Sequence, residues 1–526
     1  MPKILISDKL SPTAVQIFRD RGLDVVYEPD LGKDKAALLE AIADADGLAV
    51  RSATKATADV IAAAPRLKVI GRAGIGVDNI DLDAATNAGV VVMNTPFGNA
   101  ITTAEHAIAM MFAIARQIPQ ANASTHQGKW EKSAFMGTEV YGKTLGLIGC
   151  GNIGSIVASR ALGLKMKVAA FDPYLTPDRA VELGVEKVDL DELLARADFI
   201  TIHTPLTEQT KNILSKESLG KTKKGVRIIN CARGGLVDED ALKEALDSGH
   251  VAAAALDVFA TEPATEHPLF GHKNVVCTPH LGAATTEAQE NVALQVAEQM
   301  ADYLLTGAIT NALNMPSVTA EEAPKLRPYL ALAEDLGSFA GQLTETGVKA
   351  IEIIYAGSVS KLNRKPLTQA AIAAILKPML QGVNIVNAPT IASERGIEIT
   401  ETVTEKARNF NATIQLKVTT ERFTRTVTGT IFGGIPRVVE IKGVEMEATF
   451  SEHMLYVTNE DKPGFIGALG STLGEHGINI ATFNLGRGTA GGDAIALLAV
   501  DSEVTPDVLE AVRAIKHVKQ AKALSF

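Results

Sequence analysis

The stretch Lys143–Gly154, KTLGLIGCGNIG, decides the fold of the chain around it. An apolar run, Leu145–Ile148, leads into Gly149, Gly151 and Gly154 with the spacing G-x-G-x-x-G, and good helix formers follow. This order predicts a strand, a tight turn and a helix whose N-terminus can bind the pyrophosphate of a dinucleotide. We expect the first glycine to make the turn, the second to let the phosphates approach the backbone, and the third to let the helix pack on the strand.

An acidic residue follows at the spacing that a ribose-binding carboxylate requires. A second apolar run, Lys167–Phe171, ends in Asp172, 18 positions after Gly154. An acid about 20 residues past the glycines accepts hydrogen bonds from the ribose hydroxyls of the cofactor. Its charge repels a 2′-phosphate, and no Arg or Lys stands between Pro173 and Asp178 to bind one. The cofactor is therefore predicted to be NAD rather than NADP.

Length and composition describe an acidic chain of several domains. At about one domain per 150 residues, the 526 residues predict three or four domains. The net charge of −10 argues against nonspecific binding to nucleic acid or to anionic membranes, so neither is an expected partner. No apolar run approaches the roughly 18 residues of a membrane span and no signal peptide is recognisable, so we expect a cytoplasmic protein. Cys150, Cys231 and Cys277 are too scattered for a disulfide framework or a zinc site, and we expect reduced thiols.

Two α/β lobes are predicted in the first 315 residues. Short apolar runs alternate with helical stretches on both sides of the glycine motif, which predicts βαβ units and parallel sheets. The long helical stretches Thr102–Arg116 and Thr285–Leu305 are expected to carry the chain from the first lobe to the second and back. We therefore predict a substrate-binding lobe from residues 1–98 and 285–315 and an NAD-binding lobe from residues 99–284. A cleft between them should lie at the carboxyl ends of the strands.

The remaining residues predict two further α+β domains. Proline and charge interrupt the periodicity over Asn314–Pro328, which we interpret as a linker. Residues 316–452 should combine helices with a mostly antiparallel sheet, because β-branched and polar residues alternate from Ala412 to Phe450. Residues 453–526 follow the order strand, helix, strand, strand, helix, strand, which is the ferredoxin-like βαββαβ pattern.

Three polar segments follow predicted strands of the NAD-binding lobe, and their side chains should meet at one edge of the sheet. They are Asn230–Gly235, Asp257–Pro263 and Thr278–Gly282. Oxidation of a secondary alcohol by hydride transfer needs a base for the hydroxyl proton, a cation for the substrate and a hydride acceptor. We expect His280 to be the base, Glu262 to hydrogen-bond its far ring nitrogen, and Arg233 to be the cation.

These motifs resemble the signatures of the D-isomer-specific 2-hydroxyacid dehydrogenase family over Met1–Met315. The resemblance implies an α/β fold in which a doubly wound, Rossmann-type NAD domain is inserted in a flavodoxin-like substrate domain. It also implies that Arg233 binds substrate, Glu262 orients the imidazole and His280 acts as acid and base. The NAD-site residues implied by the resemblance are Ile75, Gly149, Gly151, Asn152, Ile153, Gly154, Asp172, Thr204, Cys231, Ala232, Arg233, Asp257, His280, Gly282 and Ala283.

Parts of the first lobe are similar to the branch of this family that oxidises 3-phospho-D-glycerate to 3-phosphooxypyruvate, the first step of L-serine synthesis. These parts are Val50–Lys55, Gly71–Asp81 and Asn94–Asn99. A phosphorylated hydroxyacid carries about three negative charges, and arginines are well suited to bind it. Lys132 lies in a loop that in this family serves the neighbouring subunit, which implies a homo-oligomer, either a dimer or a tetramer. The implied substrate contacts are Arg51, Arg72, Asn99, Lys132, Arg233 and His280.

The C-terminal residues 453–526 resemble an ACT domain, a regulatory module that pairs with a second copy and binds amino acids at the interface. The resemblance rests on NEDKPGFIG and HGINI, and the implied contacts with an L-serine effector are Asn459, Asp461 and Asn479. A dimer contact without any ligand is the alternative. Residues 316–452 resemble the intervening domain of the long form of these enzymes. Arg422 and Arg425 could hold an anion there, but a solvated strand face is the favoured interpretation.

Other functions fit the sequence less well. A glyoxylate or hydroxypyruvate reductase of the same family would need neither Arg51, Arg72 and Lys132 together nor a serine-sensing domain. An NADH-sensing transcriptional corepressor would be a binding protein on the same fold, but such proteins lack an ACT domain. An amino-acid sensor with a vestigial enzyme is disfavoured, because each expected catalytic residue is present.

Overall fold

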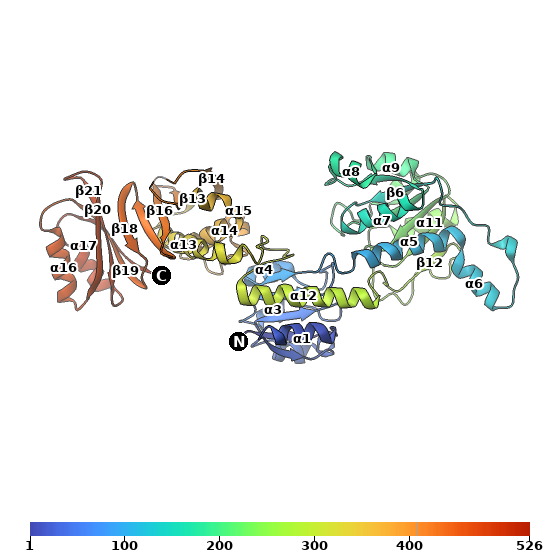
Figure 1. Ribbon diagram of the computed structural model, residues 1–526, viewed down its shortest axis with the longest axis horizontal. Coiled ribbons are helices and arrows are strands. Elements are labelled where there is room, and N and C mark those ends of the chain that lie inside the picture. The colour runs from blue at the N-terminus through green and yellow to red at the C-terminus, as the bar shows by residue number, and fades with distance from the viewer. Residues whose placement is uncertain (408) are drawn as a thin grey trace.

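The computed structural model describes residues 1–407 and 409–526, and its four sheets follow one another along an elongated molecule (Figure 1). The first sheet is parallel with the order β2-β1-β3-β4-β5, which confirms the flavodoxin-like lobe. Its strands are β1 (Lys3–Ile6), β2 (Asp24–Tyr27), β3 (Gly47–Val50), β4 (Val69–Arg72) and β5 (Val91–Met93). The helices between them are α1 (Pro12–Asp20), η1 (Leu31–Lys33), α2 (Lys35–Ala41), α3 (Ala58–Ala62) and α4 (Leu82–Ala88).

The second sheet has seven parallel strands in the order β12-β11-β10-β9-β6-β7-β8. Its order reverses between β6 and β9, which makes the predicted Rossmann-type fold and places the ligand crevice beyond the carboxyl ends of the strands. The strands are β6 (Thr144–Ile148), β7 (Lys167–Phe171), β8 (Glu186–Lys187), β9 (Phe199–Ile202), β10 (Val226–Asn230), β11 (Val251–Leu256) and β12 (Val275–Cys277). The accompanying helices are α6 (Ile118–His126), η2 (Lys132–Ala134), α7 (Asn152–Gly163), α8 (Pro177–Leu183), α9 (Leu190–Arg196), α10 (Lys216–Gly220) and α11 (Glu239–Asp247).

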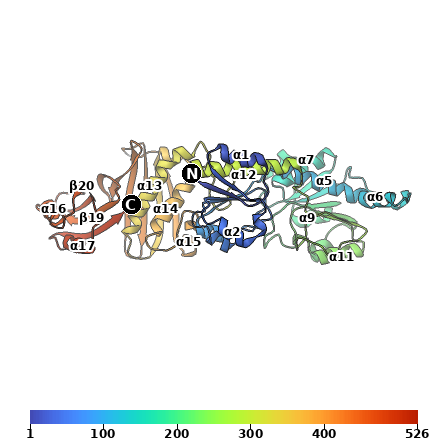
Figure 2. The same ribbon diagram turned by 90° about the horizontal axis from the view of Figure 1, so that it is seen from below.

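Two long helices, α5 (Ala100–Arg116) and α12 (Thr286–Thr306), connect the lobes. The buried face of α5 packs into the core of the NAD-binding lobe. On α12, Val296 and Met300 are fully buried in the core of the substrate lobe, so the chain returns to its first lobe. Both views show the NAD-binding lobe at one end of the molecule and the C-terminal sheet at the other (Figures 1 and 2).

The third domain places two helices on a six-stranded sheet of order β14-β13-β15-β16-β17-β18, which is antiparallel except for the pair β13 and β14. Its helices are α13 (Ala323–Gln342), η3 (Ser358–Lys361), α14 (Lys365–Leu376) and α15 (Ala388–Glu394). Its strands are β13 (Val348–Gly357), β14 (Glu398–Thr404), β15 (Ala412–Thr420), β16 (Thr424–Phe432), β17 (Ile435–Ile441) and β18 (Val444–Thr449). The predicted mostly antiparallel sheet is confirmed.

The linker interpretation of Asn314–Pro328 is wrong in its last part, because α13 begins at Ala323. Pro324 falls in the first turn, where a missing N–H removes no helical hydrogen bond. Pro328 lies inside the helix, where its missing N–H does remove a helical hydrogen bond. The buried residues Leu326 and Leu332 keep the segment helical by packing into the core, which outweighs the low helix propensity of proline.

The C-terminal domain is a four-stranded antiparallel sheet of order β20-β21-β19-β22, which confirms the ferredoxin-like prediction. Its elements are β19 (His453–Glu460), α16 (Phe465–Glu475), β20 (Ile480–Arg487), β21 (Asp493–Val500), α17 (Pro506–Arg513) and β22 (Val518–Ser525). Leu469 and Val512 of the two helices pack on one face of the sheet. On the other face, Tyr456 meets Phe339 of α13 edge to face at 5.8 Å, so the domain docks on its neighbour through a shared core.

The three cysteines are free, and burial raises the pKa of the Cys150 and Cys277 thiols to about 11. These thiols are therefore protonated and weakly nucleophilic near neutral pH. Within residues 1–407 and 409–526, no three His, Cys, Asp or Glu side chains are grouped to hold a metal ion. Among the helices described, none combines the length and the apolar character that crossing a membrane requires.

Gly337 and Gly341 on α13 allow close packing against α14, and a Gly341→Ala substitution tests this contact. A Cβ at position 341 would lie 2.4 Å from the carbonyl oxygen of Ile375, which is backbone and cannot move aside alone. We expect a loss of stability of about 1–3 kcal/mol, measured by chemical or thermal unfolding of the full chain. Gly347→Ala is the matched control, because a Cβ there meets no atom within 4 Å. Equal stability of the two variants would contradict the proposed packing role.

Candidate active site

The glycine-rich turn joins β6 to α7 in the geometry that a dinucleotide site needs. Gly149 has a φ of 90°, and a Cβ there would lie 2.6 Å from the carbonyl oxygen of His203. A Cβ on Gly154 would lie 2.1 Å from the carbonyl oxygen of Gly149, so only glycine allows this approach of helix to turn. Around Gly151 no atom lies within 4 Å of such a Cβ, which leaves open space beside the N-terminus of α7. The first N–H groups of α7, including those of Asn152 and Ile153, lack partners within the helix.

Several side chains around this turn fit an adenine dinucleotide. Asp172 follows β7, and its carboxylate accepts hydrogen bonds from the backbone N–H groups of Cys150 and Tyr174, both at 2.8 Å. These bonds place the carboxylate beside the glycine turn. The Thr204 hydroxyl beside the turn is buried without a hydrogen-bond partner, and so is the side-chain oxygen of Asn99, a predicted substrate contact at the start of α5. Buried polar atoms are normally paired, so these two atoms are suited to meet a ligand.

The other predicted NAD contacts stand at the carboxyl ends of neighbouring strands. Ile75 follows β4 in the substrate lobe, while the others follow strands of the NAD-binding lobe. Cys231 and Ala232 follow β10, Asp257 follows β11, and Gly282 and Ala283 follow β12. Parallel strands end at the same edge of a sheet, so the topology brings these residues to one rim.

Asp257 is fully buried and holds the loop that carries His280. Its carboxylate accepts hydrogen bonds from the Thr278 hydroxyl at 2.5 Å and from the backbone N–H groups of Leu281 and Gly282 at 2.7 and 2.8 Å. Burial acts to raise the pKa of Asp257, but hydrogen bonds from His106, Thr278 and the backbone hold it below its ordinary value. The carboxylate is therefore charged near neutral pH and forms a fixed anchor.

His280 and Glu262 form a hydrogen-bonded pair. Nδ1 of His280 lies 2.7 Å from Oε2 of Glu262, and the other carboxylate oxygen accepts the N–H of Phe259 at 3.0 Å. Because a carboxylate only accepts hydrogen bonds, Nδ1 is the donor, and Nε2 of the neutral ring is free to accept a proton. The imidazole is half exposed, so a substrate can reach it. This is the arrangement required of an acid-base histidine.

Arg233 reaches across from the NAD-binding lobe to the substrate lobe. Its Nε donates to the carboxylate of Asp78 at 3.1 Å, and Nη1 donates to its neighbour Ala232. A Cβ on Gly76 would lie 1.8 Å from Nη2 of Arg233, so the absence of a side chain at position 76 makes room for the guanidinium. The cation predicted to bind substrate therefore lies at the junction of the two lobes.

Two further arginines of the substrate lobe lie near Arg233. Burial, together with the charges of Arg233 and Arg51, lowers the pKa of Arg72 to about 10. Arg72 donates from Nε to the Asn79 side-chain oxygen at 3.0 Å, and the backbone N–H of Arg51 donates to the buried Asp8 at 2.6 Å. The charges of the three arginines act on one another and are offset only in part by Asp78 and Asp8, so the arginines favour a multiply charged anion.

Lys132 does not share this location. It lies exposed in η2, in the segment that follows α6 and projects from the NAD-binding lobe (Figure 1). Trp130 and Met136 in the same segment are 88% and 77% exposed. Thus the structure brings Arg51, Arg72 and Arg233 together within one chain, whereas Lys132 stands apart from them.

The three predicted effector contacts are also not assembled within one chain. Asp461 follows the end of β19, where it pairs with Arg487 at 2.9 Å. Asn479 precedes β20 and donates to Asp501 at 2.6 Å, near the other end of the sheet, where Met454 pairs with Ala499. Since a strand rises about 3.4 Å per residue, the ends of the eight-residue β19 lie roughly 24 Å apart. Asn459 is 1% exposed, and its side-chain oxygen has no hydrogen-bond partner.

The sequence-based reasoning missed three residues that support the site. Asp78 pairs with Arg233, Asn79 binds Arg72, and His106 of α5 lies 3.3 Å from both Asp257 and Thr278. Asp78 and Asn79 belong to Gly71–Asp81, a segment that resembles the family, so their polar character is a signal for a role in the site. His106 is a lone histidine in a largely apolar helix, which is a weaker signal for a role in the site.

Comparisons with known proteins agree with this geometry. The family model described as "D-isomer specific 2-hydroxyacid dehydrogenase, NAD binding domain" matches residues 108–282. A model for the "D-3-phosphoglycerate dehydrogenase intervening domain" matches residues 325–442, and an ACT domain model matches residues 453–517.

Individual relatives align with this chain over its whole length. The D-3-phosphoglycerate dehydrogenase of Bacillus subtilis is 43% identical over 100% of both chains, and that of Methanocaldococcus jannaschii is 42% identical over 100% of both. The NAD⁺-bound 3-phosphoglycerate dehydrogenase structure from Entamoeba histolytica covers 60% of this chain and 98% of its own. It has a TM-score of 0.51 and 31% sequence identity. The chain therefore belongs to the D-3-phosphoglycerate dehydrogenase family, within the NAD-dependent 2-hydroxyacid dehydrogenases, in the form that carries an intervening domain and an ACT domain.

Proposed function

We propose that this chain catalyses the NAD-dependent oxidation of 3-phospho-D-glycerate to 3-phosphooxypyruvate, the first step of L-serine synthesis. The observation that carries the proposal is a glutamate-backed histidine on the rim of an interlobe site that also holds three arginines. The names of the full-length relatives support the same substrate. If the substrate were glyoxylate, it would carry no phosphate to bind Arg51 and Arg72. The arginine cluster therefore favours the phosphorylated substrate.

In the proposed reaction His280 is the base. Its Nε2 accepts the proton of the substrate hydroxyl, while Glu262 stabilises the imidazolium that forms. Arg233 binds the substrate carboxylate and polarises the developing carbonyl, and Arg51 and Arg72 bind the phosphate. NAD, when bound beside the glycine turn, supplies the hydride acceptor. Asp172 accepts hydrogen bonds from its ribose.

We further infer that the enzyme is a homo-oligomer. Trp130 and Met136 are 88% and 77% exposed, and Ile118 of α6 is 53% exposed. The backbone of α6 and of the segment after it leaves the body of the lobe (Figure 1). Apolar side chains gathered in this way usually meet a partner surface. A second copy of the chain is the proposed partner, and Lys132 would then add its charge to that copy's catalytic site.

The ACT domain supports a small-molecule effector, and we propose L-serine, the end product of the pathway. Asp461 would bind the ammonium group, and the Asn479 amide and the buried Asn459 would bind the remaining polar groups. Because Asp461 and Asn479 lie at opposite ends of one sheet, the proposed site combines Asp461 of one chain with Asn479 of another.

The catalytic assignment is tested by His280→Asn and Glu262→Gln in an assay with 3-phosphoglycerate and NAD. We expect His280→Asn to reduce kcat at least about a hundredfold, because the proton has no other acceptor. Glu262→Gln should reduce kcat less, since it removes the charge that stabilises imidazolium but keeps a hydrogen-bonding group. NADH binding, measured by fluorescence titration, should remain in both variants. Full turnover by His280→Asn would refute the assignment.

The phosphate site is tested by Arg51→Gln, with Arg66→Gln as the matched control on the surface of the same lobe. Arg51→Gln should raise the KM for 3-phosphoglycerate about tenfold or more, with a smaller effect on kcat, because a charge-assisted contact is lost. Arg66 is exposed and pairs with the buried Asp46, which keeps its second partner Lys68, so the substitution should change neither constant. Lys132→Gln should raise KM in the same way only if the subunits assemble. An unchanged KM for Arg51→Gln, together with efficient turnover of glyoxylate, would favour the reductase instead.

The effector proposal is tested by adding L-serine to the full-length enzyme. We expect serine to bind and to lower the rate, and Asn479→Ala to weaken this inhibition about tenfold or more while leaving the rate without serine unchanged. Asn409→Ala, an exposed asparagine of the intervening domain, is the control. If serine neither binds nor inhibits, or if Asn479→Ala is inhibited normally, serine is not the ligand of this site.

A further inference from the structure

The side-chain amide of Asn79 joins the two arginines that are proposed to bind the phosphate. Asn79 stands in the turn between β4 and α4, directly after Asp78. Its Nδ2 donates to the backbone carbonyls of Arg51 and Thr54, both at 2.7 Å. Its Oδ1 accepts a hydrogen bond from Nε of Arg72 at 3.0 Å. The nitrogen and the oxygen of the amide are therefore both engaged, and each partner belongs to the arginine site.

These contacts fix the direction in which the amide points. A backbone carbonyl only accepts hydrogen bonds, and a guanidinium only donates them. The NH₂ group of Asn79 must therefore face the two carbonyls, and its oxygen must face Arg72. An aspartate carboxylate has the same shape but no donor. This position thus calls for an amide, and a carboxylate cannot make the same three bonds.

The segment Arg51–Thr54 is held between Asn79 and a buried carboxylate. Asp8 is 2% exposed. It accepts the backbone N–H of Arg51 at 2.6 Å, and the backbone N–H and the hydroxyl of Thr54 at 3.1 and 2.8 Å. Asn79 bonds the carbonyls of the same two residues. The backbone that carries Arg51 therefore cannot shift relative to Arg72 without breaking hydrogen bonds.

The backbone of Asn79 is itself fixed to a neighbouring segment of the lobe. Its carbonyl accepts the N–H of Ala56 at 2.9 Å, and the carbonyl of Ala56 accepts the N–H of Asp81 at 2.9 Å. Ala56 and Ile80, which form a parallel bridge, are 0% and 6% exposed. The amide of Asn79 is therefore presented from a rigid turn.

The contact with Asn79 leaves most of the Arg72 guanidinium available. Only Nε is used by the amide, and a Cβ on Gly74 would lie 2.4 Å from Nη1, so the glycine makes room for the guanidinium. Across residues 1–407 and 409–526, Nη1 and Nη2 of Arg72 make no hydrogen bond. These two groups can donate to an oxyanion while Nε stays bound to Asn79.

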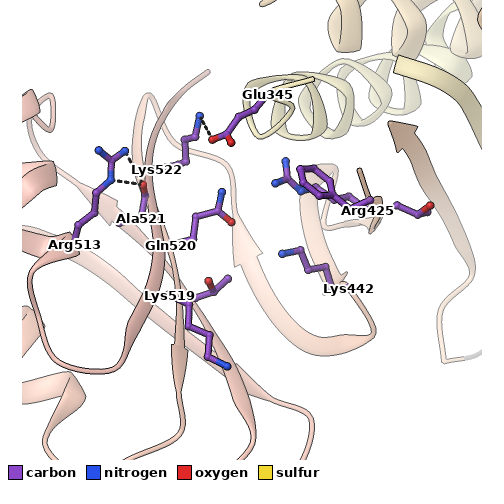
Figure 3. A pocket seen from close by; sticks show the side chains of 11 residues that line it. Glu345, Arg425, Lys442, Arg513, Lys519, Gln520, Ala521 and Lys522 are labelled. Atoms are coloured by element: carbon purple, nitrogen blue, oxygen red, sulfur yellow. Dashed lines mark hydrogen bonds and ion pairs between the residues drawn. The ribbon is translucent and has the colours of Figure 1, made fainter. Parts of the chain in front are cut away.

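The charged side chains of the cleft between the intervening domain and the ACT domain are held differently. Lys522 pairs with Glu345 at 2.9 Å, and Arg425 lies over the ring of Phe423 at 4.5 Å (Figure 3). Arg425 is half-buried, so the solvated interpretation is wrong for it, whereas Arg422 is exposed as expected. These two cations of the cleft have separate partners, whereas the two arginines of the substrate lobe share one amide.

We propose that Asn79 is a positioning residue that determines the preference of the enzyme for a phosphorylated hydroxyacid. By fixing the backbone of Arg51 against the side chain of Arg72, its amide holds two guanidinium groups that repel each other where both can bind one phosphate. Asn79 acts through these arginines and not by contact with the substrate. The inference rests on the proposed function and names the residue that sets the spacing of its phosphate site.

The proposal is tested by steady-state kinetics of full-length Asn79→Asp with 3-phosphoglycerate and NAD. The carboxylate can still accept from Arg72 but cannot donate to the carbonyls of Arg51 and Thr54. We expect the KM for 3-phosphoglycerate to rise about tenfold or more, while kcat falls less than about threefold and the KM for NAD is unchanged. Asn79→Ala, which adds no charge, should raise the same KM. Asn87→Ala, at an exposed position of α4, is the matched control and should change none of these constants.

The double variant Arg51→Gln, Asn79→Asp tests whether Asn79 acts through Arg51. If it does, Asn79→Asp should raise KM clearly less in the Arg51→Gln background than in the unmodified enzyme. The proposal is overturned if the two effects simply multiply, if kcat falls as much as kcat/KM, or if KM is unchanged in both variants of Asn79. If the unmodified enzyme does not oxidise 3-phosphoglycerate, the proposed function falls and this inference with it, whereas normal turnover with an unchanged KM in the variants overturns this inference alone.

Discussion

The catalytic rim depends on one buried carboxylate, that of Asp257. It stands at the end of β11 and receives hydrogen bonds from the hydroxyl and backbone groups of the loop after β12. The backbone carbonyl of the same residue accepts the N–H of His280 at 2.9 Å. His280 has a φ of 56°, a conformation that non-glycine residues adopt only when the surroundings impose it. Asp257 supplies that constraint through the loop backbone and Thr278, whereas the imidazole itself is hydrogen-bonded to Glu262.

The positively charged residues of the site come from both lobes, and each lobe has its own proposed role. The NAD-binding lobe carries the proposed acid-base pair and Arg233, while the substrate lobe carries Arg51 and Arg72. The Arg233–Asp78 ion pair joins the two lobes. A substrate carboxylate that binds Arg233 competes with Asp78 for the same guanidinium. Substrate binding and the contact between the lobes are therefore linked through one side chain.

The C-terminal half is organised by packing rather than by charge. Tyr456 and Phe339 join the ACT sheet to α13 in a shared apolar core, and Gln342 exchanges hydrogen bonds with the backbone of Ser525. The NAD-binding lobe lies at the opposite end of the molecule (Figure 2). An effect of the ACT domain on catalysis within one chain therefore has to pass through the intervening domain and the substrate lobe.

Local patterns in the sequence were enough to determine the fold class and the glycine turn, and they predict the roles of Asp172 and of the trio Arg233, Glu262 and His280. Each depends on residues close together in the chain, where strand periodicity and turn chemistry act directly. Tertiary structure decided the rest. Packing of α13 overrode the prolines that suggested a linker, and Asp78 meets Arg233 across 155 positions of sequence. Tyr456 of β19 likewise meets Phe339 of α13 across 117 positions of sequence. Contacts of this kind depend on how separate sheets pack against each other, and no local propensity encodes that.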